Sequence, residues 1–153
     1  MKTLIIYASI HHGNTEKIAR VIADCLNADM AKVNDVDVNT INGYDLIGFG
    51  SGIYHSKPHK KIIDLVEELP DMSCKKAFVF STSGLGKNEY NNPVKQQLEH
   101  KGFEVIGSFT CKGYDTYGPF KYIGGIAKGR PNGGDFRKAQ TFAQGIYKFF
   151  KPS

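Results

Sequence analysis

Short apolar runs alternate with amphipathic segments along the chain, and this alternation limits the possible folds more than any other feature. The run Lys2–Ala8 is too short for a buried helix and is typical of a strand covered on both faces. Similar runs recur, which gives five predicted strands: Lys2–Ala8, Asp29–Val33, Asp45–Gly50, Lys75–Ser81 and Phe103–Cys111. Because parallel neighbours need crossover helices, the pattern predicts an α/β fold with an open, doubly wound, five-stranded parallel sheet and helices on both faces.

Four amphipathic segments supply the expected crossover helices. We expect Asn14 or Thr15 to cap the first helix and Asp135 to cap the last. We expect Pro58 in the first turn of the second helix and Asn92-Pro93 at the start of the third. The 153 residues match one domain of ordinary size. We therefore expect a single domain over residues 1–153.

Three polar, glycine-containing turns follow three of the predicted strands, at Ser9–Thr15, Gly50–His55 and Ser81–Gly86. In a doubly wound sheet these turns lie at the carboxyl edge of the strands, where such folds bind ligands. The first turn runs into a helix N-terminus, whose unpaired N–H groups and dipole favour a phosphate. It contains neither GxxxxGK[ST] nor GxGxxG, so it is neither an ATPase loop nor a dinucleotide fingerprint. The sequence therefore predicts a phosphate-bearing ligand at this edge.

The residues of these turns resemble the flavodoxin family. Tyr7-Ala8-Ser9 with Gly13-Asn14-Thr15-Glu16 is similar to the signature that holds the phosphate of FMN, and the resemblance extends over the other two turns and the whole strand–helix order. It implies the flavodoxin-like strand order 2-1-3-4-5, with FMN at the switch between strands 1 and 3. It also implies that Tyr54 packs on the flavin ring. The FMN contacts implied by the resemblance are Ser9, His11, His12, Gly13, Asn14, Thr15, Ser51, Gly52, Ile53, Tyr54, His55, Thr82, Ser83, Gly84, Leu85, Gly86 and Tyr117.

The chain departs from the flavodoxin pattern at two of the turns. The phosphate turn is one residue longer than the usual form and carries His11-His12 where hydroxyl residues are common. The second turn has Tyr54-His55 where relatives often have glycine, and non-glycine residues are strained at positive φ. We therefore expect the singly reduced flavin to be less stable here than in a glycine-bearing relative.

Positive charge is concentrated in the last third of the chain. Residues 1–109 carry 12 Lys or Arg and 13 Asp or Glu, whereas residues 110–153 carry 8 and 2. The resemblance implies redox protein partners, and this basic balance favours partners of acidic character. Lys57, Lys87 and Lys112 near the strand ends should favour the reduced flavin and raise its potential relative to acidic relatives. The basic residues match no nucleic-acid reader motif, so we expect no nucleic-acid partner. No apolar stretch has the length of a membrane span or signal peptide, so we expect no membrane insertion and a cytoplasmic location.

The resemblance implies an FMN-binding electron-transfer protein that shuttles electrons between redox partners. The flavin supplies the redox chemistry in that role, so we expect an electron carrier with no catalytic side chain and no metal.

The segment Lys112–Gly134 is long, aromatic and without clear period, as functional loops often are. Because flavodoxin-like protoporphyrinogen dehydrogenases carry an aromatic, basic insertion there, the alternative is an oxidoreductase of that type or a quinone reductase. Cys25, Cys74 and Cys111 form no CxxC pair, and we expect reduced thiols.

Overall fold

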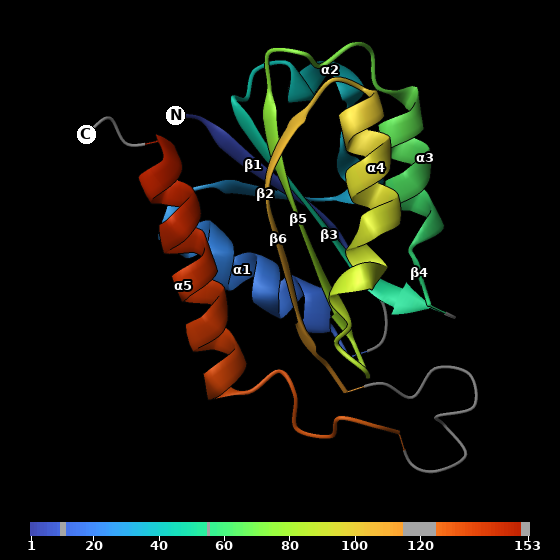
Figure 1. The fold of residues 1–153 in the computed structure, drawn as a ribbon, viewed down its shortest axis with the longest axis vertical. Coiled ribbons are helices and arrows are strands. Elements are labelled where there is room, and N and C mark those ends of the chain that lie inside the picture. Colours follow the sequence, from blue (N-terminus) through green and yellow to red (C-terminus); the bar gives the residue numbers. More distant parts are fainter. Residues whose placement is uncertain (10–11, 55, 115–124, 151–153) are drawn as a thin grey trace.

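A computed structural model describes residues 1–9, 12–54, 56–114 and 125–150. Five parallel strands form the sheet (Figure 1): β1 (Thr3–Ala8), β2 (Asp29–Lys32), β3 (Leu46–Tyr54), β5 (Lys76–Ser83) and β6 (Glu104–Lys112). Their order is β2-β1-β3-β5-β6. Counted over these five, it is the predicted order 2-1-3-4-5, and the predicted fold is confirmed. The short strand β4 (Lys57–Pro58) pairs with β3 in the antiparallel sense.

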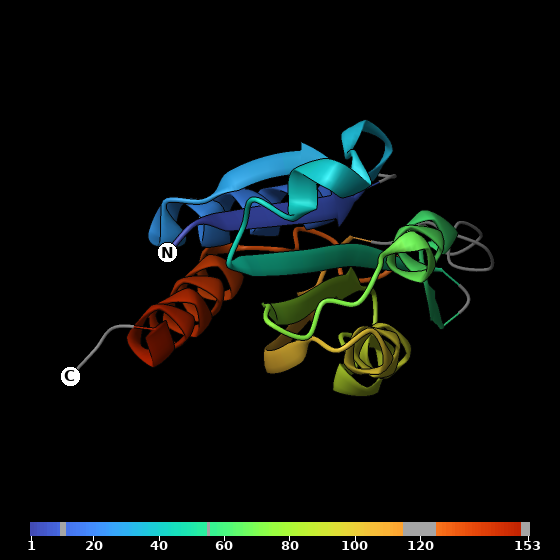
Figure 2. The ribbon, with the colours of Figure 1, turned by 90° about the horizontal axis from the view of Figure 1, so that it is seen from above.

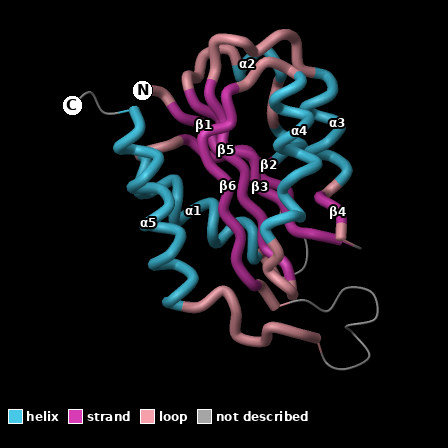
Figure 3. The backbone as a smooth tube through the Cα atoms, in the orientation of Figure 1, coloured by secondary structure: helices cyan, strands magenta, loops and turns pink. Residues whose placement is uncertain are grey.

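Helices cover both faces of the sheet (Figure 2). On one face lie α1 (Asn14–Leu26) and α5 (Gly133–Phe150), which pack against each other and cross in the view of Figure 3. On the other face lie α3 (Lys60–Glu68) and α4 (Asn92–His100). The connections contain the 3-10 turns η1 (Val33–Asp35) and η2 (Asn88–Asn91) and the one-turn helix α2 (Val38–Ile41). Within the described ranges, no helix is both long enough and apolar enough to cross a membrane.

Alternate residues of β1 enter two separate hydrophobic clusters. Leu4 and Ile6 belong to the cluster beneath α3 and α4, whereas Ile5 and Tyr7 belong to the cluster beneath α1 and α5. All four side chains are buried. A strand buried on both faces needs apolar residues at every position, which explains the continuous run seen in the sequence.

Two glycines of β3 make room for two phenylalanine rings of the neighbouring strand β5. In the parallel register Gly48 pairs with Phe78, and Gly50 pairs with Phe80. A Cβ atom at Gly48 would lie 2.3 Å from the Phe78 ring, and one at Gly50 would lie 2.1 Å from the Phe80 ring. Both rings are fully buried in a dense interior. The glycines therefore allow bulky rings of β5 to lie across β3.

The ends of two strands lie later in the chain than the sequence predicts. β3 continues to Tyr54 and β5 to Ser83, so most of the second predicted turn and half of the third are strand. Glycine marks a turn in the sequence, but here Gly52 stays in the ladder because it pairs with Thr82 of β5. Each of these strands therefore carries its candidate site residues up to the carboxyl edge of the sheet.

Two predicted helix starts, at Pro58 and at Asp135, are wrong, and the predicted capping of the first helix by Asn14 or Thr15 is wrong as well. Pro58 is not in a helical turn, because it pairs with Ile53 in the β3–β4 hairpin and α3 begins two residues later. α1 begins at Asn14 and has no side-chain cap. Asp135 does not precede the last helix but lies in the first turn of α5, where it accepts a hydrogen bond from the Asn132 N–H at 2.8 Å.

We expect Gly50→Ala to lower the free energy of unfolding by about 1–3 kcal/mol, because an extra methyl group in a dense core forces its neighbours off their rotamers. Gly145→Ala in α5 is the control. No atom lies within 4 Å of its Cβ position, and alanine is the better helix former, so this variant should be as stable as the wild type or more stable. Urea unfolding measures both. Equal unfolding midpoints for wild type and Gly50→Ala would contradict the packing of Phe80 on Gly50.

Candidate functional site

The three predicted turns are called the first, second and third loops below. The first loop brings the chain from β1 into α1 through two residues in the left-handed region. His12 has φ 54° and Gly13 has φ 65°, and α1 begins at the next residue. The Ser9 hydroxyl accepts a hydrogen bond from the Glu16 N–H at 3.4 Å. Apart from the two chain neighbours of Gly13, no atom of the described residues lies within 4 Å of the position where its Cβ would be. Among these residues, Gly13 therefore has open space beside it, directly before the N-terminus of α1.

A buried pair of hydroxyl groups joins the first loop to the third. The Oγ1 atoms of Thr15 and Thr82 lie 2.8 Å apart, and both side chains are buried. Thr15 lies in the first turn of α1, and Thr82 lies near the end of β5. Because a buried hydroxyl needs a partner, this hydrogen bond holds the start of α1 against the end of β5.

The chain after β6 is tied to both of these loops. The Asn14 side-chain amide donates to the Tyr114 carbonyl at 2.8 Å, and the Gly113 N–H donates to the Ser83 carbonyl at 2.9 Å. The Tyr114 ring also lies against the His12 ring, with 4.4 Å between the ring centres. The start of the segment Lys112–Gly134 therefore packs on the first loop.

The second loop is held by its own polar groups. The buried Ser51 hydroxyl donates to the Gly52 carbonyl and accepts from the His59 N–H at 2.8 Å. The Tyr54 ring meets the His59 ring edge to face at 5.7 Å, and the Tyr54 hydroxyl lies 2.5 Å from where a Cβ of Gly52 would be. Tyr54 therefore folds back along the end of β3, beside the buried Ile53.

The third loop closes through a side chain as well. The Ser83 hydroxyl accepts from the Gly86 N–H at 2.7 Å, and Gly86 has φ 62°. Gly84 is buried between them, whereas 49% of the Leu85 surface is exposed. Leu85 is thus an exposed large apolar side chain at the carboxyl edge of the sheet.

The structure brings together candidate residues from all three turns at one edge of the sheet. His11, His55 and Tyr117 lie outside the described residues. Just after the second predicted turn, Ser56 lies in the left-handed region, with φ 64°. The hydroxyls of Ser51 and Ser83 bond within their own loops, so they act on loop shape.

A cavity of about 210 Å³ beside the first loop has a wall that sequence reasoning missed. Ser9, Gly13 and Glu16 line one side, and further lining residues are Lys32, Asn34, His59 and Lys61. Lys32 ends β2 and Asn34 follows it, whereas His59 caps α3 and Lys61 lies in its first turn, after the β3–β4 hairpin. The rule that ligands bind at the carboxyl edge of strands could have indicated them, but a charged residue near a strand end is usually only solvated.

Two titratable groups at this cavity have shifted pKa values. Burial, together with the hydrogen bond that its hydroxyl donates to Glu16 Oε1 at 2.7 Å, raises the pKa of Tyr7 to about 12. Burial and the nearby Lys61 charge lower the pKa of His59, whose Nδ1 accepts from the Lys61 N–H at 3.1 Å. Tyr7 thus stays protonated as a donor, and its hydrogen bond orients the Glu16 carboxylate.

The base of the segment Lys112–Gly134 is fixed by a partly buried ion pair. The Arg130 guanidinium donates through Nε and Nη2 to the two carboxylate oxygens of Asp135, which is 2% exposed. The Arg130 carbonyl accepts from the Tyr114 N–H at 2.8 Å. The two ends of the segment are therefore joined. Hydrogen bonding to Arg130 holds the pKa of Asp135 below its usual range.

We expect Arg130→Gln to lower the free energy of unfolding at pH 7 by about 1–3 kcal/mol, because the buried Asp135 carboxylate loses its charged partner. A carboxyl with a lowered folded-state pKa adds stability above its unfolded-state pKa and loses it as the pH falls through the folded-state value. The difference between variant and wild type should therefore shrink in acid. Urea unfolding between pH 7 and pH 3 measures it.

Lys60→Gln is the matched control, since it breaks the exposed Lys60–Asp64 pair, which is worth only about 0.3–0.5 kcal/mol. A loss for Arg130→Gln no larger than that of Lys60→Gln would contradict the role of the Arg130–Asp135 pair.

Comparison with known proteins agrees with this geometry. Residues 4–121 match the family model described as a flavodoxin domain, which is more than half of the chain. An uncharacterized protein of Methanocaldococcus jannaschii is 51% identical over 150 residues, covering 97% of this chain and 99% of that protein.

Two solved structures share the whole fold. Oxidised Flavodoxin 2 from Bacillus cereus has a TM-score of 0.75 at 23% identity, covering 98% of this chain and 100% of that one. A flavodoxin from the domain Archaea has a TM-score of 0.71 at 18% identity, covering 97% and 98%. With the family match, these observations lead to one assignment: the chain belongs to the flavodoxin family, whose cofactor is FMN.

Proposed function

We propose that the protein binds one FMN at the carboxyl edge of its sheet and carries electrons between redox partners. The observation that carries the proposal is the set of hydrogen bonds that joins the loops at the start of α1. Thr15 with Thr82 and Asn14 with the Tyr114 carbonyl hold the first loop, the third loop and the chain after β6 together. A rigid edge of this kind can hold a flavin without large rearrangement.

The donors at the first loop fit the phosphate of FMN. Ser9, His12, Gly13, Asn14 and Thr15 surround or form the N-terminus of α1, where backbone N–H groups and the helix dipole favour an anion. The open space at Gly13 supports the fit, because a phosphate needs close approach to the backbone. The Asn14 amide group is engaged with Tyr114, so Asn14 acts through its backbone and as a positioning residue.

The second and third loops supply the walls for the flavin ring. We assign the half-buried Tyr54 to one face of the flavin ring and the exposed Leu85 to the other. The other proposed contacts are made by the loop backbone and smaller groups of Ser51, Gly52, Ile53, Thr82, Ser83, Gly84 and Gly86. FMN supplies the electron-transfer chemistry when bound, and these residues orient it and limit its contact with water.

The charge around this edge favours an acidic redox partner. Three exposed lysines lie at or just after the ends of strands at this edge: Lys57 in β4, Lys87 after β5 and Lys112 at the end of β6. Leu85, after β5, is an exposed apolar side chain at the same edge. A basic edge with an exposed apolar residue suits a negatively charged protein that docks transiently, since complementary charge raises the association rate. The Tyr114 ring, at the start of the segment Lys112–Gly134, packs on the first loop. We therefore propose an electron carrier rather than an enzyme in which this segment binds a substrate.

We expect the purified apoprotein to bind FMN in a one-to-one ratio with micromolar or stronger affinity, measured by quenching of flavin fluorescence. Gly13→Ala should weaken FMN binding by about tenfold, because a side chain at positive φ moves the N–H groups that meet the charged phosphate. Gly129→Ala is the matched control: Gly129 also has positive φ and open space at its Cβ position, but it lies outside the three loops. Equal FMN affinity in the two variants would contradict the proposed phosphate site.

A second measurement separates the carrier from the enzyme. The reduced holoprotein should pass electrons to an acidic redox protein faster than to a basic one of similar potential, and added salt should remove the difference. Catalytic turnover of a quinone or a porphyrinogen at rates above the protein-to-protein transfer would instead identify an oxidoreductase.

A further inference from the structure

The cavity beside the first loop is lined by cationic side chains that are not among the phosphate contacts proposed above. It connects Ser9 and Gly13, on the side of the proposed phosphate site, to Lys32 at the end of β2 and Lys61 in α3. In Figure 1 the start of α3 and the start of α1 lie toward the same end of the sheet. Residues from two distant parts of the sequence therefore face one cavity.

The first turn of α3 has the wrong charge for its own helix. A helix N-terminus is positive and favours acidic residues, but α3 has none in its first turn and begins with Lys60 and Lys61. In α1, by contrast, the first turn carries Glu16. A local rule that is broken in this way often marks a functional position. The dipole of α3 and the Lys61 side chain together make this wall of the cavity positive.

The acidic group in the cavity does not cancel this charge. Glu16 lines the same cavity, and its Oε1 accepts the hydrogen bond from the Tyr7 hydroxyl at 2.7 Å. Among the lining residues, Lys32 and Lys61 stand against the single carboxylate of Glu16, and within the described part of the chain no ion pair joins either lysine to it. The charged side chains that line the cavity therefore carry a net positive charge.

We propose that Lys32 and Lys61 form a cationic wall that recognises the phosphate dianion at the first loop and makes the site select FMN over riboflavin. This inference rests on the proposed function. The backbone of the first loop supplies directional hydrogen bonds, and the two lysines supply charge that acts over several ångströms. FMN affinity should then depend on salt, whereas riboflavin affinity should not.

Flavin titrations of the apoprotein test the wall. We expect Lys32→Gln and Lys61→Gln each to weaken FMN binding by about two- to fivefold at low salt, the range for exposed charge pairs, and the double variant by about tenfold. Riboflavin affinity should stay unchanged in all three variants. In 1 M NaCl, where the Debye length is about 3 Å, the differences should disappear. Both lysines are exposed, so the variants should fold normally.

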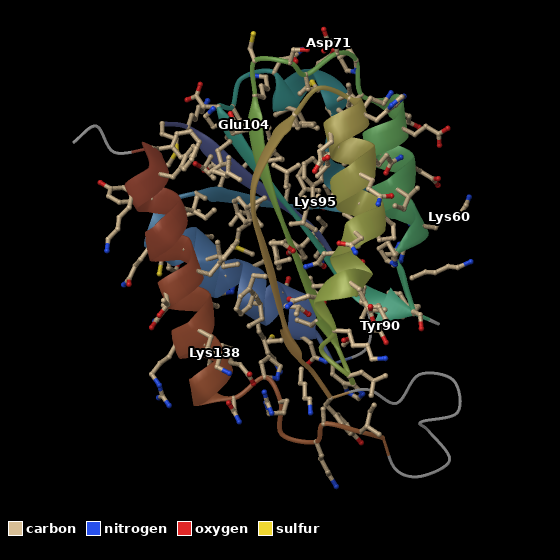
Figure 4. All side chains as sticks on the ribbon, in the orientation of Figure 1. Lys60, Asp71, Tyr90, Lys95, Glu104 and Lys138 are labelled. Atoms are coloured by element: carbon tan, nitrogen blue, oxygen red, sulfur yellow. The ribbon has the colours of Figure 1, made fainter. Side chains whose placement is uncertain are left out.

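Lys60→Gln is the matched control, because Lys60 is adjacent in sequence but lies on the outer side of α3, where it pairs with Asp64 (Figure 4). It should not change FMN affinity. Equal FMN affinity in Lys60→Gln and Lys61→Gln, or an equal loss of riboflavin binding, would overturn the cationic wall while leaving FMN binding intact.

A wild-type protein that bound no flavin would overturn the proposed function, and the wall would then be tested with inorganic phosphate alone. Amide NMR shifts of Gly13 and Lys61 that move together on phosphate addition, and stay still in the double variant, would support the wall. The wall would be overturned if phosphate moved neither amide signal in the wild type. It would also be overturned if phosphate moved the signals in the double variant as far as it does in the wild type.

Discussion

The hydrogen bond between the hydroxyls of Thr15 and Thr82 is the contact on which the candidate site depends. It is buried, and it connects the first turn of α1 to the end of β5, two strands away from β1 in the sheet. β3 lies between β1 and β5, so this one contact fixes the first and third loops on either side of the second. A hydroxyl pair closed from water is stronger than one at the surface, which suits a site that must keep its shape while a charged ligand enters and leaves.

The sheet gives that contact a rigid base. Phe78 and Phe80 of β5 lie across the glycines of β3, and the strands keep an unbroken parallel register up to the pair Gly52 and Thr82. Close packing of this kind resists deformation, so the strand ends keep a constant relation to each other. The polar groups at the edge then only need to shape the loops, which is what Ser51 and Ser83 do.

The residue pattern predicts the strands and the edge that holds the candidate site, and the resemblance to the flavodoxin family implies the strand order. Continuous apolar runs identify strands buried on both faces, and polar residues after those runs identify the carboxyl edge. The ends of β3 and β5 were harder, because Gly50 and Gly52 are typical of turns and only pairing with β5 makes them strand. Pro58 was misjudged for a similar reason: its place in the short β3–β4 hairpin depends on a tight turn through Ser56 at positive φ.

The proposed cationic wall is only weakly marked in the sequence: the strand-edge rule indicates Lys32 at the end of β2, but Lys61 joins it at one cavity only through the tertiary fold. The most direct test of the account is a crystal structure of the protein with FMN. We predict that the phosphate lies within hydrogen-bonding distance of the backbone N–H groups at the start of α1, with the flavin ring between Tyr54 and the third loop. A phosphate bound away from α1, or a ring outside the edge formed by the three loops, would contradict the account.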